Sequence, residues 1–278
     1  MFSLIASILA SAFIAVIMRL SSDRVHSPLA MLFSNYLICT LLGIIYTDFQ
    51  IFLPQVPGYF GTLGMSLING CMYLGSFMLF QYSTRKNGVV LSSIFMKLGL
   101  LVPMAMSVLV FREFPSVVQL LGFGLAVTAI LLINYQKGSE KGNLGLGLLL
   151  LLLLAGCGDA MSKIFNMVGN ADLEDQFLLF TYGTAFILCT TVMIGRREKP
   201  GMQELIYGAL IGIPNFFSTK FMLAALIDVP AVVAFPTFSV ATMLLVTLAG
   251  TVFFREKLSK NQWIALVIIL VALALLNM

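Results

Sequence analysis

Two long segments of the chain repeat one another, and this repeat constrains the fold more than any other feature of the sequence. Residues 81–134 align with residues 224–277 without a gap. Several charged and polar positions match: Phe111-Arg112-Glu113 falls on Phe254-Arg255-Glu256, and Ser116, Gln119 and Asn134 fall on Ser259, Gln262 and Asn277. A match of this length within one chain indicates an internal duplication.

Each copy consists of an apolar segment, a short polar connection and a second apolar segment. A helix needs ~20 apolar residues to cross a bilayer, so each copy predicts a transmembrane hairpin. The connection, F-R-E-x-x-S-x-x-Q, also has the Ser and Gln of a helix-start capping box. The chain is 60% hydrophobic and 10% charged, whereas a soluble domain is about 25% charged. We therefore expect an integral, multi-pass membrane protein without a large soluble core.

The expected fold is an all-α polytopic membrane protein. Ten transmembrane helices are predicted, at residues 2–20, 28–46, 58–81, 88–111, 116–135, 143–163, 176–195, 202–225, 230–254 and 260–277. Within the eighth of these, Gly208-x-x-x-Gly212 is a motif for close helix packing, which we expect inside the chain.

Weaker matches extend the duplication to the earlier spans. Leu32-Phe33-Ser34 resembles Leu179-Phe180-Thr181, and the stretch from Ala12 to Arg19 can be laid on the stretch from Gly156 to Lys163. These matches predict two five-helix repeats, residues 1–135 and 143–278, joined by a connecting loop at 136–142. Because five is odd, the second repeat enters the membrane in the opposite orientation, which is how many secondary transporters are built.

The repeated pattern of apolar helix, F-x-E, x-x-S-x-x-Q and apolar helix, in a chain with ten spans, resembles the EamA-type transporters of the drug/metabolite transporter superfamily. The resemblance covers almost the whole chain. It implies a secondary transporter whose fourth and ninth helices line a central cavity. Where the family usually has Gly before the Glu of the connection, this chain has Arg112 and Arg255.

Two criteria predict opposite orientations in the membrane. Twelve of the 16 Lys and Arg residues fall in odd-numbered connections between predicted spans, while the even-numbered ones hold only Arg112 and, at a span end, Lys163. Because basic loops stay in the cytoplasm, this distribution places both termini outside. The family resemblance implies termini inside.

Ionisable residues within spans are the sharpest functional signal, because a charge at the bilayer centre costs ~3 kcal/mol or more. Lys97 lies nine residues into the fourth predicted span, ~13 Å from its end. It is predicted to bind an anionic group of a substrate; the alternative is a structural pair with a buried carboxylate. Lys220 ends the polar stretch Pro214–Lys220 in the eighth span, and either lines the cavity or reaches the interface.

Asp159 and Lys163 are four residues apart in the sixth span and share a helix face, which predicts an ion pair. The pair is either interfacial and structural or a switch linked to a proton or the substrate. Glu113 and Glu256 are expected to shape the connections. Polar residues at comparable depth are candidates either for lining the cavity or for hydrogen bonds between helices: Asn35, Asn69, Tyr73, Tyr182 and Asn215, together with Ser34, Tyr36 and Thr181.

These observations predict a secondary transporter of a small polar metabolite that carries a carboxylate or phosphate. The alternatives are efflux of cationic or hydrophobic compounds, with Asp159 as the site, and a non-transporting scaffold or accessory flippase subunit. No motif for ATP hydrolysis or proteolysis is present, so enzyme activity is not expected. We expect a monomer in a cell membrane of the bacterial inner type, whose partners are the lipid bilayer, the substrate and a proton or counter-substrate. Neither nucleic acid nor a cofactor is expected.

Metal binding is also not expected. His26 is the only histidine, and Cys39, Cys71, Cys157 and Cys189 are scattered singly through apolar segments. Isolated cysteines of this kind are typical of small packing residues.

Overall fold

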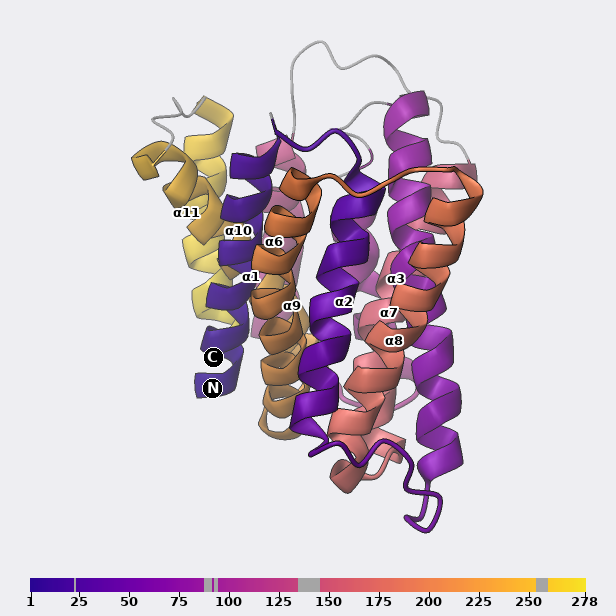
Figure 1. Cartoon of the computed structure of the whole chain (residues 1–278). Coiled ribbons are helices and arrows are strands. Elements are labelled where there is room, and N and C mark those ends of the chain that lie inside the picture. The colour runs from indigo at the N-terminus through magenta and orange to yellow at the C-terminus, as the bar shows by residue number, and fades with distance from the viewer. Residues whose placement is uncertain (23, 88–91, 93–94, 135–145, 254–259) are drawn as a thin grey trace.

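The computed structural model describes residues 1–278 except for 23, 88–91, 93–94, 135–145 and 254–259, and the described residues form helices joined by short connections (Figure 1). Seven helices are long and apolar enough to cross a membrane. They are α1 (Phe2–Ser21), α2 (Pro28–Tyr46), α3 (Tyr59–Asn87), α7 (Leu146–Val168), α8 (Glu174–Gly195), α9 (Met202–Asp228) and α10 (Ala231–Phe253).

Three shorter apolar helices complete the described fold. They are the Phe95–Leu109 helix, which contains the 3₁₀ turn η1 (Leu98–Leu100) and α5 (Leu101–Leu109), then α6 (Val117–Asn134) and α11 (Lys260–Leu276). A second 3₁₀ turn, η2 (Ala171–Leu173), precedes α8. These three helices lie within the fourth, fifth and tenth predicted spans. The start of the fourth lies outside the described residues.

Local sequence signals fix where helices begin. The Ser27 hydroxyl accepts a hydrogen bond from the backbone N–H of Ala30 (3.1 Å), and Pro28 occupies the first position of α2, where a missing N–H costs nothing. At the start of α6, Ser116 Oγ accepts from Gln119 N (3.2 Å), while Gln119 Oε1 accepts from Ser116 N (3.0 Å). This reciprocal pair confirms the capping box predicted in the first connection.

The main helix contacts cross between the two sequence halves. Helix α2 packs against α8 and α9, α3 against α7 and α8, α1 against α9 and α10, and α6 against α11. The α2–α9 contact depends on the predicted glycine motif: a Cβ on Gly208 would lie 2.3 Å from the Met31 carbonyl oxygen, and one on Gly212 would lie 2.9 Å from that of Asn35. The two backbones can approach this closely only with glycine at both positions.

The contacts also give the relative directions of the helices. Gly208 and Gly212 meet Met31 and Asn35 in the same order, so α2 and α9 run parallel. Helices α3 and α7 run antiparallel, because Gly147 lies against Tyr82 and the later Gly158 lies against the earlier Tyr73. Both chain termini lie at one end of the bundle (Figure 1). We call this the termini side.

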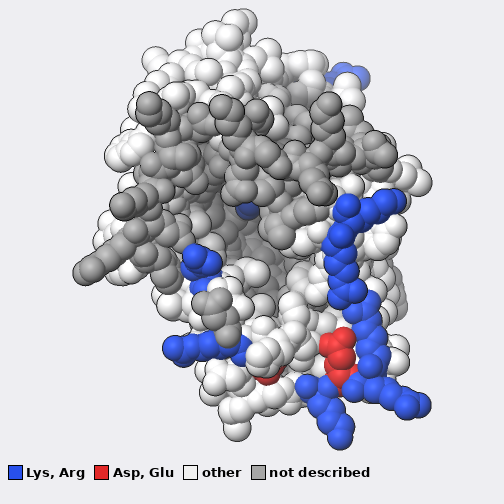
Figure 2. Space-filling model, turned by 90° about the horizontal axis from the view of Figure 1, so that it is seen from above, with Lys and Arg blue, Asp and Glu red and all other residues white. Residues whose placement is uncertain are grey.

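Lys and Arg side chains gather on the opposite end of the molecule, as Figure 2 shows. Arg85 and Lys86 lie in the last turn of α3, and Arg196 and Arg197 directly follow α8. Cations near the C-termini of helices also interact favourably with the helix dipole.

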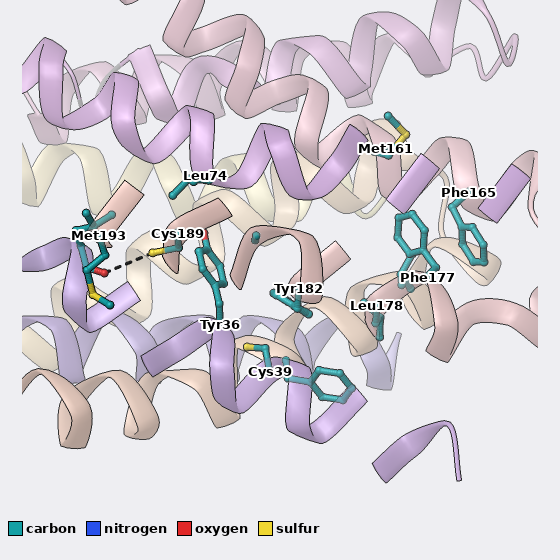
Figure 3. Packing of buried hydrophobic residues seen from close by; sticks show 14 of the residues in the cluster. Tyr36, Cys39, Leu74, Met161, Phe165, Phe177, Leu178, Tyr182, Cys189 and Met193 are labelled. Carbon is teal, nitrogen blue, oxygen red and sulfur yellow. Dashed lines mark hydrogen bonds between the residues drawn. The ribbon is translucent and has the colours of Figure 1, made fainter. Parts of the chain in front are cut away.

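The largest buried core lies among α2, α3, α7, α8 and α9 (Figure 3). Phe165 and Phe177 stack with ring centroids 4.3 Å apart, and Tyr182 packs near Tyr36 at 6.4 Å. The Cys189 thiol contacts the Leu29 carbonyl oxygen at 3.6 Å. All four cysteines are free.

Candidate functional site

A cavity of about 410 Å³ lies between residues of both sequence halves. The first half contributes α1, α2, α3 and the Phe95–Leu109 helix, and the second contributes α7, α9 and α10. Figure 2 shows a hollow in the face opposite the termini, with a basic side chain in its depth. The wall is largely apolar, and its polar and charged members are Ser11, Asn35, Tyr36, Tyr73, Ser76, Lys97, Asp159, Ser162, Asn215, Ser218, Thr219 and Ser239.

Lys97 and Asp159 bring opposite charges into this cavity, one from each half. The two charges interact electrostatically. Neither side chain, however, makes an ion pair within 4.0 Å with another described residue. Lys97 lines the cavity and is solvent-exposed, so water reaches its side chain there.

These two charges break the symmetry of the duplication. In the repeat, Lys97 falls on Val240, which is fully buried, and Asp159 falls on Ala15. A charge needed only to hold the shared scaffold would be expected in both copies. The charges instead mark a place where the two halves differ and where solvent is present, which is typical of a binding site.

A close helix contact places Lys97 near Asp159. A Cβ on Gly156 would lie 2.3 Å from the Gly99 carbonyl oxygen, so only glycine permits this approach of α7 to the η1 turn. Pro103 lacks the N–H that would bond the carbonyl four residues earlier, that of Gly99, and this favours the local departure from α-helix. The Gly99–Gly156 contact thus holds the turn that carries Lys97 against the helix that carries Asp159.

At the wall of the cavity, a hydrogen-bond network joins α2, α8 and α9. The Asn215 amide donates to Asn35 Oδ1 (3.2 Å), and both residues line the cavity. The Tyr182 hydroxyl lies 2.6 Å from Thr219 Oγ1 and donates to the Asn215 carbonyl oxygen (3.3 Å). Tyr182 is fully buried and does not line the cavity, so it positions the residues that do.

The other predicted polar residues divide in the same way. Tyr36 and Tyr73 line the cavity. Ser34 instead donates to the Leu205 carbonyl oxygen (2.7 Å) across the α2–α9 contact. Asn69 and Thr181 are buried away from the cavity, and their side-chain polar atoms have no hydrogen-bond partner among the described residues.

The predicted ion pair between Asp159 and Lys163 is wrong. Lys163 Nζ lies 2.6 Å from Glu113 Oε1, in the connection before α6. Asp159 faces the cavity, one helical turn away from this contact. Helical spacing identifies only local partners, and here a residue fifty positions away in sequence takes the bond.

Lys220 does not line the cavity, so the first of its two predicted positions is wrong. Its ammonium group forms an ion pair with Asp175, at the start of α8, and lies 4.0 Å from the centroid of the Tyr46 ring. These partners fix the lysine toward the end of α9, among aromatic side chains. The cavity therefore contains one described lysine, Lys97, facing one described carboxylate, Asp159.

A family model for the EamA-like transporter family matches residues 1–135 and 145–278. The chain belongs to the EamA-like transporter family. This family lies within the drug/metabolite transporter superfamily, as the repeated connection predicted. With its seven long apolar helices, this EamA-family chain is an integral, multi-pass membrane protein.

Two other proteins resemble this EamA-family chain along almost its full length. A protein of Haemophilus influenzae (strain ATCC 51907 / DSM 11121 / KW20 / Rd), described as an uncharacterized protein, is 24% identical over 290 positions that span 98% of this chain and 96% of that protein. A solved crystal structure matches with a TM-score of 0.78 at 15% identity, covering 99% of this chain and 96% of that one. At this identity the second likeness concerns the fold alone.

One departure from the usual EamA pattern has a structural consequence. Arg112 occupies the position before Glu113 where the family usually has Gly, and its φ is 55°, in the left-handed region. Glycine adopts this conformation without strain, whereas for another residue the conformation costs of order 1 kcal/mol of stability. The turn is therefore kept in this EamA chain despite an unfavourable residue, and it directs Glu113 toward Lys163 and α10.

Sequence reasoning missed the partners of the deep lysines and the aromatic wall of the cavity. Phe235 and Phe238 of α10 line the cavity beside Ser239, and no polar signal distinguishes them from core residues. Asp175 was detectable as an acid directly before the predicted span 176–195. Among the described residues, no group of three or more His, Cys, Asp or Glu residues forms a metal-binding arrangement.

Proposed function

We propose that this EamA-family protein is a secondary transporter of a small polar metabolite carrying a carboxylate or phosphate, which binds Lys97 in the cavity. The observation that carries this proposal is the solvent-exposed Lys97, which lines the cavity and makes no ion pair with another described residue. A charged group at this depth is stabilised by an anion, and a substrate can supply it.

The rest of the cavity refines the class of substrate. Asp159 lies in the same cavity and partly compensates the charge of Lys97. A ligand that also carries a cationic group would satisfy both side chains, while the apolar wall would accept a hydrocarbon part. A volume of about 410 Å³ is within the range of about 300–1,000 Å³ typical of small-molecule sites.

Transport would proceed by alternating access between two inverted repeats, residues 1–135 and 143–278 with a connecting loop at 136–142. The helix directions support this arrangement. Helices α1 and α3 both leave the termini side (Figure 1), and α7, the expected counterpart of α1, runs antiparallel to α3. Contacts such as α1 with α9 and α7 with α3 also exchange with one another when the halves are exchanged. Such symmetry is what two equivalent states of an inverted-repeat transporter require.

Efflux of cationic compounds is the second candidate, and Asp159 favours it. In that case the carboxylate would bind the substrate, and Lys97 would act as its internal counter-ion when the cavity is empty. A non-transporting scaffold would have no need of a solvent-reached charge pair in a cavity.

The test is thermal stabilisation of the purified protein by four probes: succinate, glucose 6-phosphate, L-methionine and tetraphenylphosphonium. A ligand at 100 times its Kd stabilises the folded state by about 2.7 kcal/mol, which raises the melting temperature by several degrees. We expect stabilisation by an anionic or zwitterionic probe that is lost in Lys97→Gln. The matched control is Lys220→Gln, which removes a lysine outside the cavity and should keep the ligand effect. Stabilisation by tetraphenylphosphonium alone, retained in Lys97→Gln and lost in Asp159→Asn, would support efflux instead.

A further inference from the structure

We infer that Glu113 and Lys163 form a latch that closes the cavity on the termini side and must open for the cavity to connect with that side. The latch is defined as the Glu113 carboxylate with its three partners: the Lys163 ammonium group, the Ser107 hydroxyl and the backbone N–H of Ala231. It goes beyond the substrate site, because none of these four residues lines the cavity.

One carboxylate gathers all the bonds of the latch. Lys163 Nζ donates to Glu113 Oε1 at 2.6 Å. The Ser107 hydroxyl and the Ala231 N–H both donate to Oε2, at 2.8 and 3.1 Å. Ala231 is the first residue of α10, so the carboxylate also lies at the positive end of a helix dipole. The Glu113 N–H donates to the Ser107 carbonyl oxygen at 3.0 Å, which fixes the turn that presents the carboxylate.

The latch lies directly beyond the cavity on three of its walls. Lys163 follows the cavity residue Ser162 on α7, and Ala231 lies one helical turn before the cavity residue Phe235 on α10. Ser107 is on the same helix as Lys97, farther toward the termini side. The latch therefore draws together the helices that would have to separate for a path to open at this end.

The burial of the two partners distinguishes this contact from a permanently closed ion pair. The Lys163 side chain is 4% exposed, whereas that of Glu113 is 22% exposed. Water can therefore reach the carboxylate, and it can replace the bonds of Glu113 when the helices part. The turn that presents Glu113 has the left-handed Arg112 at its centre, so the closed arrangement includes local strain that opening can release.

The latch also joins the two sequence halves. Glu113 and Ser107 belong to the first repeat, while Lys163 and Ala231 belong to the second. The other described ion pair on the termini side, Asp175 with Lys220, joins α8 to α9 within the second half and makes a natural control. The duplication places Glu256 and Arg19 at the positions of Glu113 and Lys163; Glu256 lies outside the described residues.

The experiment measures access to the cavity from each side of the membrane, and it requires no substrate. A reporter cysteine replaces Ser239, which lines the cavity, in a background with Cys71 and Cys157 changed to Ala and the buried Cys39 and Cys189 retained. Labelling by a membrane-impermeant maleimide is followed in vesicles of each orientation. We expect the parent to react from the side opposite the termini and to be protected from the termini side.

Glu113→Gln and Lys163→Met should each raise the rate of labelling from the termini side by about tenfold or more, because loss of the ion pair shifts the population toward the opened state. Asp175→Asn should leave that rate unchanged. Continued labelling of both variants from the side opposite the termini would show that the rise does not come from a simple folding defect.

Unchanged protection in both single variants, with the reporter still labelled from the opposite side, would overturn the latch. So would an equal rise in Asp175→Asn. Neither result would bear on ligand binding by Lys97, which the thermal stabilisation test addresses separately.

Discussion

The molecule contains two sets of opposite charges that bridge its halves, and they differ in how they are paired. In the cavity, Lys97 and Asp159 interact at a distance and water reaches the lysine. On the termini side, Glu113 and Lys163 are in direct contact at 2.6 Å, with further hydrogen bonds to the carboxylate. The same residue types therefore serve different ends: a contact that is already satisfied holds helices together, while charges left apart are available to a ligand.

Removing one partner of the satisfied pair should have the largest effect on stability. Glu113→Ala leaves the Lys163 side chain, which is 4% exposed, without its carboxylate partner. Breaking a buried pair in this way costs about 3–5 kcal/mol, and the partial exposure of Glu113 places the expected loss toward the low end. The measurement is the melting temperature in detergent. A double variant, Glu113→Gln with Lys163→Met, should recover much of the loss because no unpaired charge remains.

The glycine contact that links the Lys97 turn to α7 gives the next largest effect. Gly156→Ala would place a Cβ 2.3 Å from the Gly99 carbonyl oxygen and 2.6 Å from a Val102 methyl carbon. The helices must move apart, which costs about 1–3 kcal/mol and separates Lys97 from Asp159. Both the melting temperature and the stabilisation by the bound probe should fall. Gly124→Ala is the matched control, since nothing lies within 4 Å of its added Cβ; an equal loss there would show that the effect is not specific to the contact.

Lys163→Met and Lys97→Met should affect the melting temperature differently, because one lysine is paired and the other makes no ion pair with a described residue. Lys163→Met should lower the melting temperature because it leaves the Glu113 carboxylate without its ammonium partner. Lys97→Met should leave it unchanged or raise it by up to about 1 kcal/mol equivalent, because binding sites are not optimised for the stability of the empty protein. A loss of several degrees in Lys97→Met, comparable to Lys163→Met, would make Lys97 a structural residue.

The smallest expected effect lies outside both charge sets. Ser116→Ala removes the hydroxyl that accepts from the Gln119 N–H, one of the two hydrogen bonds of the capping box at the start of α6. The cost is about 1 kcal/mol, measured as a small drop in melting temperature with no change in ligand stabilisation. A changed ligand response would mean that the connection bearing Glu113 also affects the cavity.

Much of the fold could be predicted because hydropathy and the duplication act over long stretches of sequence. The seven long helices lie where apolar runs predicted them, and Ser116 and Gln119 form the expected cap. Depth in a span also identified Lys97 and Asp159, and both line the cavity. These features depend on local sequence and on the thickness of a bilayer.

The partners of the lysines could not be predicted, because they depend on how distant helices pack. Lys163 bonds to Glu113, and Lys220 to Asp175, across separations of 50 and 45 residues. A spacing of four residues had suggested Asp159 for Lys163, yet α7 turns Asp159 toward the cavity and Lys163 toward the termini side. The predicted position of Lys220 in the cavity was wrong for the same reason, since Lys220 pairs with Asp175 elsewhere.

Protection of a cavity residue by a bound probe tests directly whether Lys97 binds the substrate there. The Ser239→Cys reporter is alkylated from the side opposite the termini in the presence of each of the four probes. We predict that an anionic or zwitterionic probe slows alkylation in the parent and in Lys220→Gln, but not in Lys97→Gln. Equal protection in Lys97→Gln and the parent, or protection by tetraphenylphosphonium alone, would contradict the assignment of Lys97.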